Sequence, residues 1–353
     1  MANEPNNTPT EREASLVTIA REVGVDPSLV SRVLRDDPNA RISPQKRSQI
    51  LEVVERTGYR PNRVAKSLRT RHTHILAMLT PDITNPFHSW LFRAVEARAN
   101  ALGYHVILCN TDDDPERSSK VVSTLCEGHI DGMLFANARE DDSSIDMLRR
   151  RNIPYVLMNR RRRGKDDPWF GTDSARVGRI GGRHLLDLGH RRIAYVDGDV
   201  TVEQVGGRRD GFLDVMREAG LSIDADLMAT GLRSRTEART VMSTMLSLPQ
   251  DRRPTAVFVP RSTLVDGVMD AVHAANLTVP GDVSILGFNA VRDPVVTSIR
   301  LPIEEIGEQA VAYLIHALQA GLPAAEQCRV EFETVLIDRG TTAPVPDGVA
   351  GVR

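Results

Sequence analysis

Short apolar runs alternate with helical stretches along the greater part of this chain, and this alternation constrains the fold more than any other feature. The runs ILAMLT, YHVILCN and DGMLFAN are followed by helical stretches that begin near Pro86, Glu116 and Ser143, and YVLMN ends the series. A second series starts after Asp173 with a helix to Leu188 and contains IAYVDG, AVFVP and VSILGFN. Strands that alternate with helices form parallel sheets covered on both faces. Two series predict two α/β lobes, with a ligand site between them at the carboxyl ends of the strands.

Residues 16–34 carry a different pattern, in which apolar positions three or four apart form two short segments joined by Gly24. Glycine suits the positive φ of a tight turn, and Asp26 followed by Pro27 is typical of a helix start. A third helix is predicted over residues 43–57, between Ser43 as N-cap and Gly58 as the stop. The pattern predicts an all-α helix-turn-helix headpiece. Its predicted core contains Ile19, Val23, Val25, Val30, Val33, Ile50, Val53 and Val54.

Basic residues are concentrated next to this headpiece, although the whole chain has a net charge of only −2. Residues 41–72 contain nine Lys/Arg and two Asp/Glu, a local charge of 9 − 2 = +7. Such a block indicates a polyanion partner, and the alternative is a solvated helix surface.

If the headpiece binds DNA, its second helix enters the major groove with its N-terminal residues at base edges. This placement nominates Pro27, Ser28, Ser31 and Arg32. Arg32 is expected to pair with guanine or, alternatively, with a phosphate. The other possibility for the whole segment is a helical bundle that binds a protein.

The runs VTIAREVGVDPSLVSRVL and SPQKRSQILEVVERTGYRPNRVAKSLRT resemble the headpiece of the LacI/GalR family of repressors. The resemblance implies a hinge helix over residues 63–69, in which Leu68 wedges into the minor groove and Ala65 allows close approach of a paired hinge. The chain departs from the family at three positions. Asp26 stands where a serine is common, and Leu29 stands where a threonine is common. Pro27 stands at a position whose side chain often contacts a base. The operator sequence therefore does not transfer. The DNA-binding residues expected are Thr18, Pro27, Ser28, Leu29, Ser31, Arg32, Asn62, Arg63, Ala65, Leu68 and Arg69.

Similarity to the same family continues to about Asp338, through PDITNPF, LGHRRIA and SILGF among other motifs. It implies a two-lobed sensor resembling a periplasmic solute-binding protein. Phe87 is expected to stack on a sugar ring or a base, or else to belong to the core. Arg208 is expected to bind hydroxyls or a carboxylate, or else to form a surface ion pair. His190 is expected to be structural and to cap the preceding helix. The implied effector residues are Phe87, His88, Asn159, Arg160, Arg208, Arg261 and Asn289.

Two departures bear on what is sensed. Arg261-Ser262 stands where the family usually has Asn-Asp, and Asn289-Ala290 stands where it usually has Asp-Asp. Fewer acids and an added base make the predicted cleft more positive. We therefore expect an anionic effector, such as a sugar phosphate or a sugar acid.

Other classes of protein fit the sequence less well. The sequence contains no P-loop, GxSxG, HExxH or Rossmann glycine motif, so neither an enzyme nor a cofactor is expected. Asp112, Asp113 and Asp114 lack partners at metal-ligand spacing, so no metal is expected. Three separated cysteines, no secretory signal and no apolar run of about 18 residues favour a cytoplasmic protein without a membrane segment. The alternative functions are a cytosolic solute-binding protein or an enzyme on the same scaffold.

A single headpiece buries too little surface for high specificity, so a homodimer on a pseudo-palindromic site in double-stranded DNA is expected. The C-terminal segment lacks a leucine heptad, so no tetramerising coiled coil is expected. The predicted function is a repressor controlled by a small, carbohydrate-like effector. The expected organisation is a disordered tail at 1–14, the headpiece at 15–60, a hinge helix and linker at 61–73, an effector-binding domain at 74–340 and a flexible tail at 341–353. Lobe 1 is expected at about 74–172 and 301–328, and lobe 2 at about 173–300 and 329–340.

Overall fold

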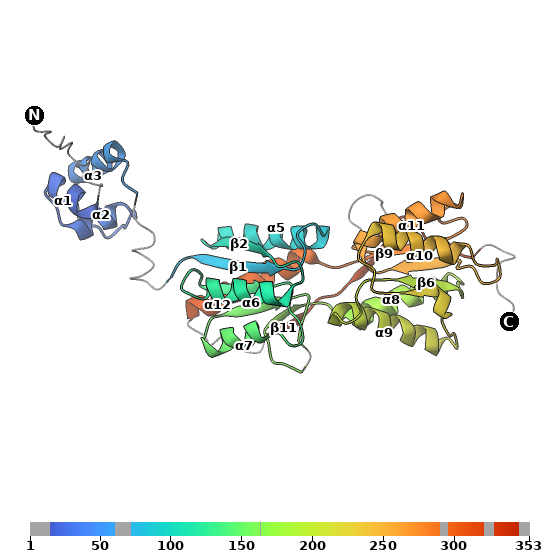
Figure 1. Cartoon of the computed structure of the whole chain (residues 1–353). Helices are drawn as coiled ribbons and strands as arrows, with labels where there is room; N and C mark the ends of the chain where they lie inside the picture. Colours follow the sequence, from blue (N-terminus) through green and yellow to red (C-terminus); the bar gives the residue numbers. More distant parts are fainter. Residues whose placement is uncertain (1–14, 61–71, 163, 290–295, 321–327, 346–353) are drawn as a thin grey trace, which may run out of the picture. The chain divides into compact units, whose positions relative to one another are not determined.

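The computed structural model describes residues 15–60, 72–162, 164–289, 296–320 and 328–345. The chain divides into two compact units, residues 1–73 and residues 74–353, which are considered separately (Figure 1). Within the described residues, no helix is both long and apolar enough to cross a membrane.

The described part of the first unit, residues 15–60, is a headpiece of three helices that confirms the helix-turn-helix prediction. Gly24 ends the first helix with a φ of 69°, and Gly58 ends the third with a φ of 62°. Asp26 caps the second helix by accepting a hydrogen bond from the backbone N–H of Ser28. Most of the predicted apolar side chains are buried together, with Val25 and Val54 partly buried at the edge of the cluster. The helices are α1 (Leu16–Val23), α2 (Pro27–Val33) and α3 (Pro44–Thr57).

The described residues of the second unit form two six-stranded sheets with helices on both faces, which confirms the two-lobed α/β prediction (Figure 1). The first sheet is parallel throughout, in the order β11-β5-β4-β3-β1-β2. The run ILAMLT forms β1, which pairs with β2 and β3 and is buried from its second residue onward, as expected of a strand covered on both faces. The elements of this lobe are β1 (Ile75–Thr80), α5 (Pro86–Ala101), β2 (His105–Asn110), α6 (Pro115–Leu125), β3 (Gly132–Phe135), α7 (Ser143–Arg150), β4 (Tyr155–Met158), β5 (Trp169–Gly171), α12 (Ile303–Ala320) and β11 (Arg329–Glu331).

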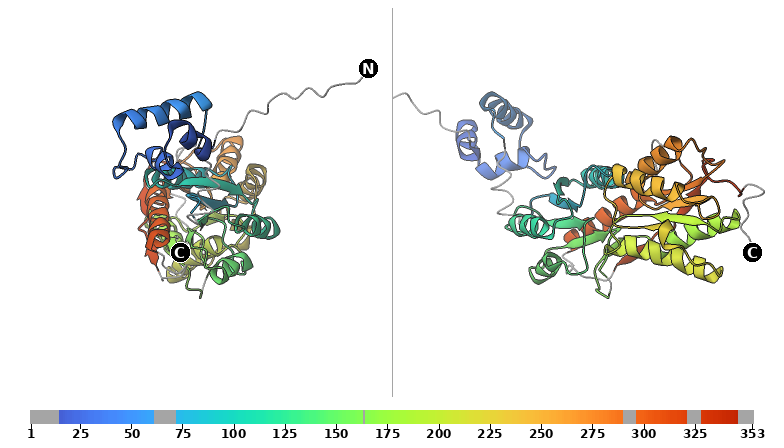
Figure 2. Two further views of the ribbon diagram at one scale, coloured as in Figure 1. Left: turned by 90° about the vertical axis from the view of Figure 1, so that its left-hand side faces the viewer. Right: turned by 45° about the vertical axis from the view of Figure 1, so that its right-hand side comes forward.

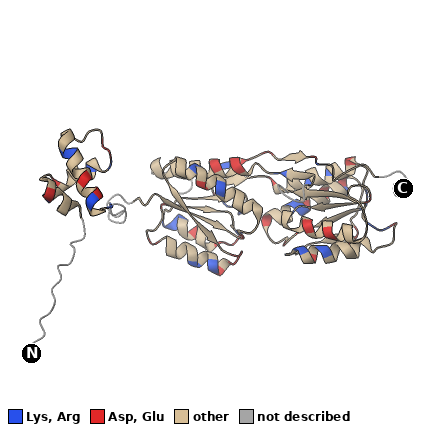
Figure 3. Ribbon diagram, turned by 90° about the horizontal axis from the view of Figure 1, so that it is seen from above, with Lys and Arg blue, Asp and Glu red and all other residues tan. Residues whose placement is uncertain are grey.

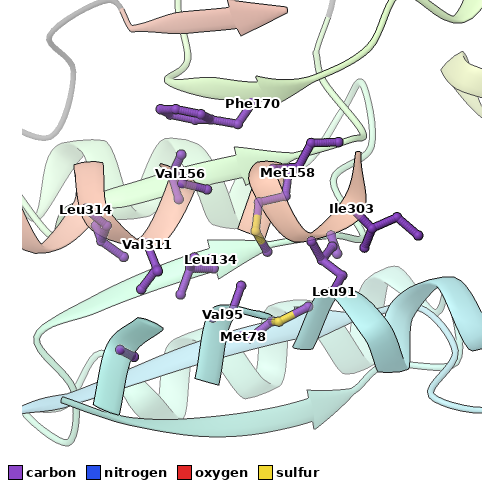
Figure 4. Packing of buried hydrophobic residues seen from close by; sticks show 14 of the residues in the cluster. Met78, Leu91, Val95, Leu134, Val156, Met158, Phe170, Ile303, Val311 and Leu314 are labelled. Atoms are coloured by element: carbon purple, nitrogen blue, oxygen red, sulfur yellow. The ribbon is translucent and has the colours of Figure 1, made fainter. Parts of the chain in front are cut away.

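Helix α12 lies far along the chain but completes the core of the first lobe. It packs against α5 and β4. Leu91 and Val95 of α5 join Val311 and Leu314 of α12 and Met78 of β1 in one buried cluster (Figure 4). The first lobe is therefore complete only after the chain has returned from the second.

The second sheet has the order β12-β10-β9-β8-β6-β7, and it is parallel except that β12 pairs antiparallel with β10. Helices α8 and α9 cover one face, and α10 and α11 cover the other (Figure 2). The elements are α8 (Ser174–Asp187), β6 (Ile193–Val196), α9 (Glu203–Glu218), a 3₁₀ helix (Ala225–Leu227), β7 (Met228–Ala229), α10 (Arg235–Leu246), β8 (Ala256–Val259), α11 (Ser262–Ala274), β9 (Ser284–Phe288), β10 (Ser298–Arg300) and β12 (Val335–Ile337).

Two glycines allow α8 and α9 to approach closely. A Cβ placed on Gly178 would lie 1.9 Å from the carbonyl oxygen of Arg208, and one on Gly211 would lie 1.9 Å from that of Ala175. These distances leave room for hydrogen only. The contact therefore fixes the position of α9, which carries Arg208.

The chain passes between the lobes after β5, after β10 and after β11. The sequence pattern places residues 329–340 in lobe 2, which is wrong for residues 329–331. These residues form β11, which pairs with β5 at the edge of the first sheet and satisfies its backbone groups there.

The prediction of a flexible tail from residue 341 is also wrong for residues 341–345. The carbonyl of Thr341 accepts a hydrogen bond from the Ile285 N–H at 2.7 Å, and the Val345 N–H donates to the Leu188 carbonyl at 3.0 Å. The Nε2 atom of buried His190 lies 3.0 Å from the carbonyl oxygen of Ala343, and its Nδ1 lies 2.9 Å from Thr255 Oγ1. His190 is structural, as expected: its backbone N–H donates to the Leu185 carbonyl at the end of α8 at 3.1 Å, which caps that helix. Its ring also contacts the tail and the hydroxyls of Thr255 and Ser284.

Candidate functional site

The N-terminal end of α2 is the predicted DNA-reading surface. Ser28 is exposed there, while Pro27, Leu29, Ser31 and Arg32 are half-buried. On α1, the hydroxyl of Thr18 accepts a hydrogen bond from the Ser15 N–H at 2.8 Å, as part of the cap of that helix.

Arg32 is already engaged within the headpiece. Its Nε lies 2.9 Å from Asp37 Oδ2, and its Nη2 donates to the carbonyl oxygen of Asn39 at 2.7 Å. Hydrogen bonds from the Asn39 backbone and from Arg32 lower the pKa of Asp37. These two bonds leave hydrogens of Nη1 and Nη2 for DNA, and both the base and the phosphate alternatives remain predictions.

Part of the basic block stabilises the headpiece. Lys46 Nζ donates to the Val23 carbonyl at the end of α1, Arg47 pairs with Asp36 at 2.7 Å, and Arg56 pairs with Glu22. Arg41 and Arg60 are exposed. Charges of both signs are interleaved over the helices of the chain (Figure 3). The predicted hinge residues Asn62, Arg63, Ala65, Leu68 and Arg69 lie outside the described residues.

A cleft of about 690 Å³ opens between the two lobes of the second unit, within the usual size range of small-molecule sites. It lies at the carboxyl ends of the strands, where an α/β protein positions polar loops. The structure brings all of the sequence-predicted effector residues to its wall, namely Phe87, His88, Asn159, Arg160, Arg208, Arg261 and Asn289.

Several lining residues were not anticipated from the sequence. Asp82, Arg139 and Asp199 follow β1, β3 and β6, so their position after a strand is a signal that could have found them. Gln204 lies in the first turn of α9, and Arg233 lies just before α10. Helix positions of this kind carry no comparable signal.

Arg208 is buried, with 8% of its surface exposed, so it is not a surface ion-pair residue. Its Nη2 lies 3.5 Å from Asp197 Oδ2, and its guanidinium carbon lies 5.0 Å from the ring centroid of Phe288. Asp197 is fully buried and accepts hydrogen bonds from the Tyr195 hydroxyl at 2.9 Å and the Gly198 N–H at 2.7 Å. A buried carboxylate and an aromatic face therefore hold the arginine in the cleft wall.

The first lobe contributes Phe87 and His88 from the start of α5. Phe87 belongs to the core cluster, which confirms one of its two expected roles, and it also lines the cleft; its stacking on a ligand stays a prediction. The two rings pack edge to face with centroids 5.0 Å apart. Burial, and after it the charge of Arg160, lower the pKa of His88 to about 3, so the imidazole is neutral at physiological pH.

Other groups at the wall are fixed by local contacts. Arg160 Nη1 lies 2.6 Å from Asp113 Oδ1. Asn159 and Asn289 end β4 and β9 with positive φ values of 61° and 49°, a conformation that asparagine tolerates. The Asn289 Oδ1 atom accepts a hydrogen bond from the Leu301 N–H at 2.8 Å, which ties the end of β9 to the second crossing between the lobes.

Four buried polar atoms at the cleft have no hydrogen-bond partner in the described part of the chain: His88 Nδ1, Gln204 Nε2, Arg208 Nε and Asn289 Nδ2. Unsatisfied buried groups are uncommon, and a bound polar ligand is one way to satisfy them. Over the same residues, no group of three or more His, Cys, Asp or Glu is arranged to hold a metal ion.

A segment of each unit matches a known protein family. Residues 15–62 match the family of bacterial regulatory proteins of the lacI type, and residues 183–342 match a periplasmic binding protein-like domain. The ribose operon repressor of Escherichia coli (strain K12) is 30% identical over 334 residues, covering 93% of this chain and 99% of that protein. The PurR transcriptional repressor of Erwinia tasmaniensis is 29% identical over 340 residues, covering 94% and 98%.

Solved structures agree with this assignment. The lac repressor dimer bound to operator and the anti-inducer ONPF has a TM-score of 0.82, with 22% identity over 94% of this chain and 100% of that one. A LacI family regulator from Lactobacillus casei with bound sucrose has a TM-score of 0.65, with 26% identity over 76% and 99%. The matched proteins are regulators of transcription, so this chain is a DNA-binding transcriptional regulator, not an enzyme, and belongs to the lacI family of bacterial regulatory proteins.

Proposed function

We propose that the chain is a homodimeric repressor that binds a pseudo-palindromic operator, and that a small polar metabolite in the cleft between the lobes controls this binding. The observation that carries the proposal is the combination, in one chain, of a helix-turn-helix headpiece with a cleft whose wall contains buried polar groups that lack partners. Transcriptional control requires access to the genome, so we place the protein in the cytoplasm.

The DNA contacts proposed are those of α2 and of the segment after the headpiece. Ser28 is the most accessible of the described candidates on α2. A hinge of about seven residues is too short to be a stable helix by itself, so it should order only when paired across the dimer and bound to DNA. Thr18, Asn62, Arg63 and Arg69 are proposed to contact the backbone, and Leu68 to enter the minor groove.

Effector control is proposed to act through the relative position of the lobes. Arg161, after β4, lies 3.3 Å from Glu203 at the start of α9, so an ion pair joins lobe 1 to lobe 2. A ligand that contacts both lobes changes the stability of one arrangement relative to another. By linkage, DNA and effector must change each other's affinity by the same factor, commonly 5- to 150-fold.

A gel-shift assay with the full chain tests the proposal. Fragments from the promoters next to its gene should include one that binds with preference over a scrambled fragment of equal length, and a metabolite should change this affinity. Loss of preference after Ser28→Ala combined with Leu68→Ala would support the assigned surface. Equal binding to every fragment, with and without metabolites, would contradict the proposed function.

A further inference from the structure

We infer that the lobe 2 side of the cleft binds an oxyanion, a phosphate or carboxylate group carried by the effector. This inference deepens the proposed function and rests on it, because it takes the cleft to be the effector site. The first observation concerns helix starts. Helices α5, α6, α7, α8 and α10 each begin with an Asp, Asn or Ser side chain that accepts a hydrogen bond from a backbone N–H.

Helices α9 and α11 differ from these. Val202 and Arg261 stand at their N-cap positions, and neither makes a side-chain cap hydrogen bond within the described residues. Both helix starts open onto the cleft, since Val202, Gln204, Arg261 and Ser262 line it. Free backbone N–H groups at a helix start bear partial positive charge and favour an anion.

The second observation concerns side chains instead of backbone groups. Gln204, Arg208 and Asn289 are 3%, 8% and 5% exposed, and each has a buried nitrogen without a hydrogen-bond partner in the described structure. The Gln204 Nε2 and Arg208 Nε atoms, like the amide nitrogen of Asn289, can only donate. All three residues line the same cleft and belong to lobe 2. A ligand that satisfies them must offer several acceptor oxygens.

The charges of the wall agree with this assignment. The charged groups on the lobe 2 side are three arginines, Arg208, Arg233 and Arg261, and two aspartates, Asp197 and Asp199. Their net charge is 3 − 2 = +1. The side chain of Arg261 lies over Gly198, where a Cβ would come within 2.3 Å of Nη1, and this places it beside the Asp197 and Arg208 pair.

The lobe 1 wall has the opposite balance. Its charged groups are Asp82, Asp112 and Asp113 and the two arginines Arg139 and Arg160, so the net charge is 2 − 3 = −1 with His88 neutral. Carboxylates suit ligand hydroxyls as hydrogen-bond acceptors. The effector class is therefore a polyhydroxylated metabolite with its oxyanion toward α9 and α11.

Calorimetric titration of the full chain with inorganic phosphate, against chloride at equal ionic strength, tests the subsite. We expect phosphate to bind with a Kd on the order of 1 mM. Arg261→Gln should weaken it by about 10-fold, because a charge-assisted hydrogen bond is lost. Gln204→Glu places a carboxylate at the start of α9 and should abolish binding. The control Arg239→Gln changes an exposed arginine of α10 outside the cleft wall and should leave phosphate binding unchanged.

Titration with glucose 6-phosphate, gluconate and glucose then separates the two oxyanions. Tighter binding of glucose 6-phosphate than glucose supports a phosphate, and tighter binding of gluconate supports a carboxylate. The inference is overturned if phosphate does not bind, if it binds Arg261→Gln and Gln204→Glu as well as the unmodified protein, or if glucose binds more tightly than both anions. Operator binding is measured in the same samples. Retained operator binding with no localised anion site refutes this inference alone, whereas absent operator binding refutes the proposed function.

Discussion

Gly178→Ala tests whether the close packing of α8 on α9 positions the cleft residues. The new Cβ would lie 1.9 Å from the Arg208 carbonyl oxygen and 2.7 Å from the Phe212 nitrogen, both backbone atoms that cannot rotate away. Ordinary contact begins at 3.4 Å, so the two helices must separate by about 3.4 − 1.9 = 1.5 Å. Overpacking costs about 1–3 kcal/mol, and a shift of this size belongs at the upper end. Alanine recovers about 1 kcal/mol of helix propensity, which leaves a net loss of about 2 kcal/mol.

Gly307→Ala is the matched control, because Gly307 is also the fifth residue of its helix, α12. Its nearest neighbours would be the Ala94 Cβ at 3.0 Å and the Leu91 carbonyl oxygen at 3.2 Å, so a movement of a few tenths of an ångström suffices. The same gain in propensity should offset this small strain, so little net change in unfolding free energy is expected.

Urea unfolding of both variants, followed by circular dichroism, measures the difference in unfolding free energy. Phosphate titration of the folded proteins should show weaker binding for Gly178→Ala only, because only that change displaces Arg208 and Gln204. The reasoning fails if the two variants unfold at the same urea concentration and bind phosphate equally.

Three further predictions concern His190, the pair of Asp197 with Arg208, and the expected hinge. Burial lowers the pKa of His190 to about 4 from its usual 6.5. As the pH falls, the unfolded chain therefore binds a proton at this residue before the folded chain does. The contribution of the neutral imidazole to the free energy of unfolding should be complete above about pH 6.5 and fall by up to about 3 kcal/mol as the pH drops to 4. His190→Gln should flatten this slope in unfolding experiments across that range, and an unchanged slope would contradict the assignment. Asp197→Asn leaves Arg208 buried without its counter-ion, so the free energy of unfolding measured with denaturant should fall by about 3 kcal/mol. Added phosphate should restore part of this loss. An unchanged free energy of unfolding without phosphate would show that the ion pair contributes little. Leu68→Ala should weaken operator binding more than non-specific DNA binding, and equal losses on both types of DNA would contradict its assignment as a minor-groove wedge. Arg69→Ala should weaken binding to both types of DNA and make the affinity less dependent on salt, which gel shifts at several salt concentrations measure.

The fold was predictable from sequence because its determinants are local and periodic. The turn at Gly24, the cap at Asp26 and the mainly apolar ILAMLT strand are each local signals for one conformation. Polar residues directly after strands were predictable as cleft residues for the same topological reason. Asn159 and Asn289, which end β4 and β9 with positive φ, belong to this group.

The remaining features depend on contacts between residues far apart in the sequence. Nothing local shows that Asp197 is buried behind Arg208 or that Gln204 reaches the cleft without a partner. The pairing of Arg32 with Asp37 is local, but a basic residue on a recognition helix carries the same pattern whether it pairs internally or with DNA. The tail to residue 345 resembles a linker in composition, yet His190 and Ile285 bind it through hydrogen bonds that only the folded lobe creates.

The assignment of the oxyanion to lobe 2 separates binding from signalling. Inorganic phosphate held by Gln204, Arg208 and Arg261 would contact only lobe 2. It would therefore bind equally well to two arrangements of the lobes, and such a ligand does not shift the equilibrium between them. A sugar phosphate or sugar acid that also reaches Asn159 and Arg160 on lobe 1 would gain affinity in only one arrangement. We therefore expect phosphate to bind at millimolar concentration without changing operator affinity, whereas the larger effector changes it by about 10-fold or more. Gel shifts at fixed ionic strength measure both, and a change in operator affinity produced by phosphate alone would show that the lobe 2 subsite is itself the switch.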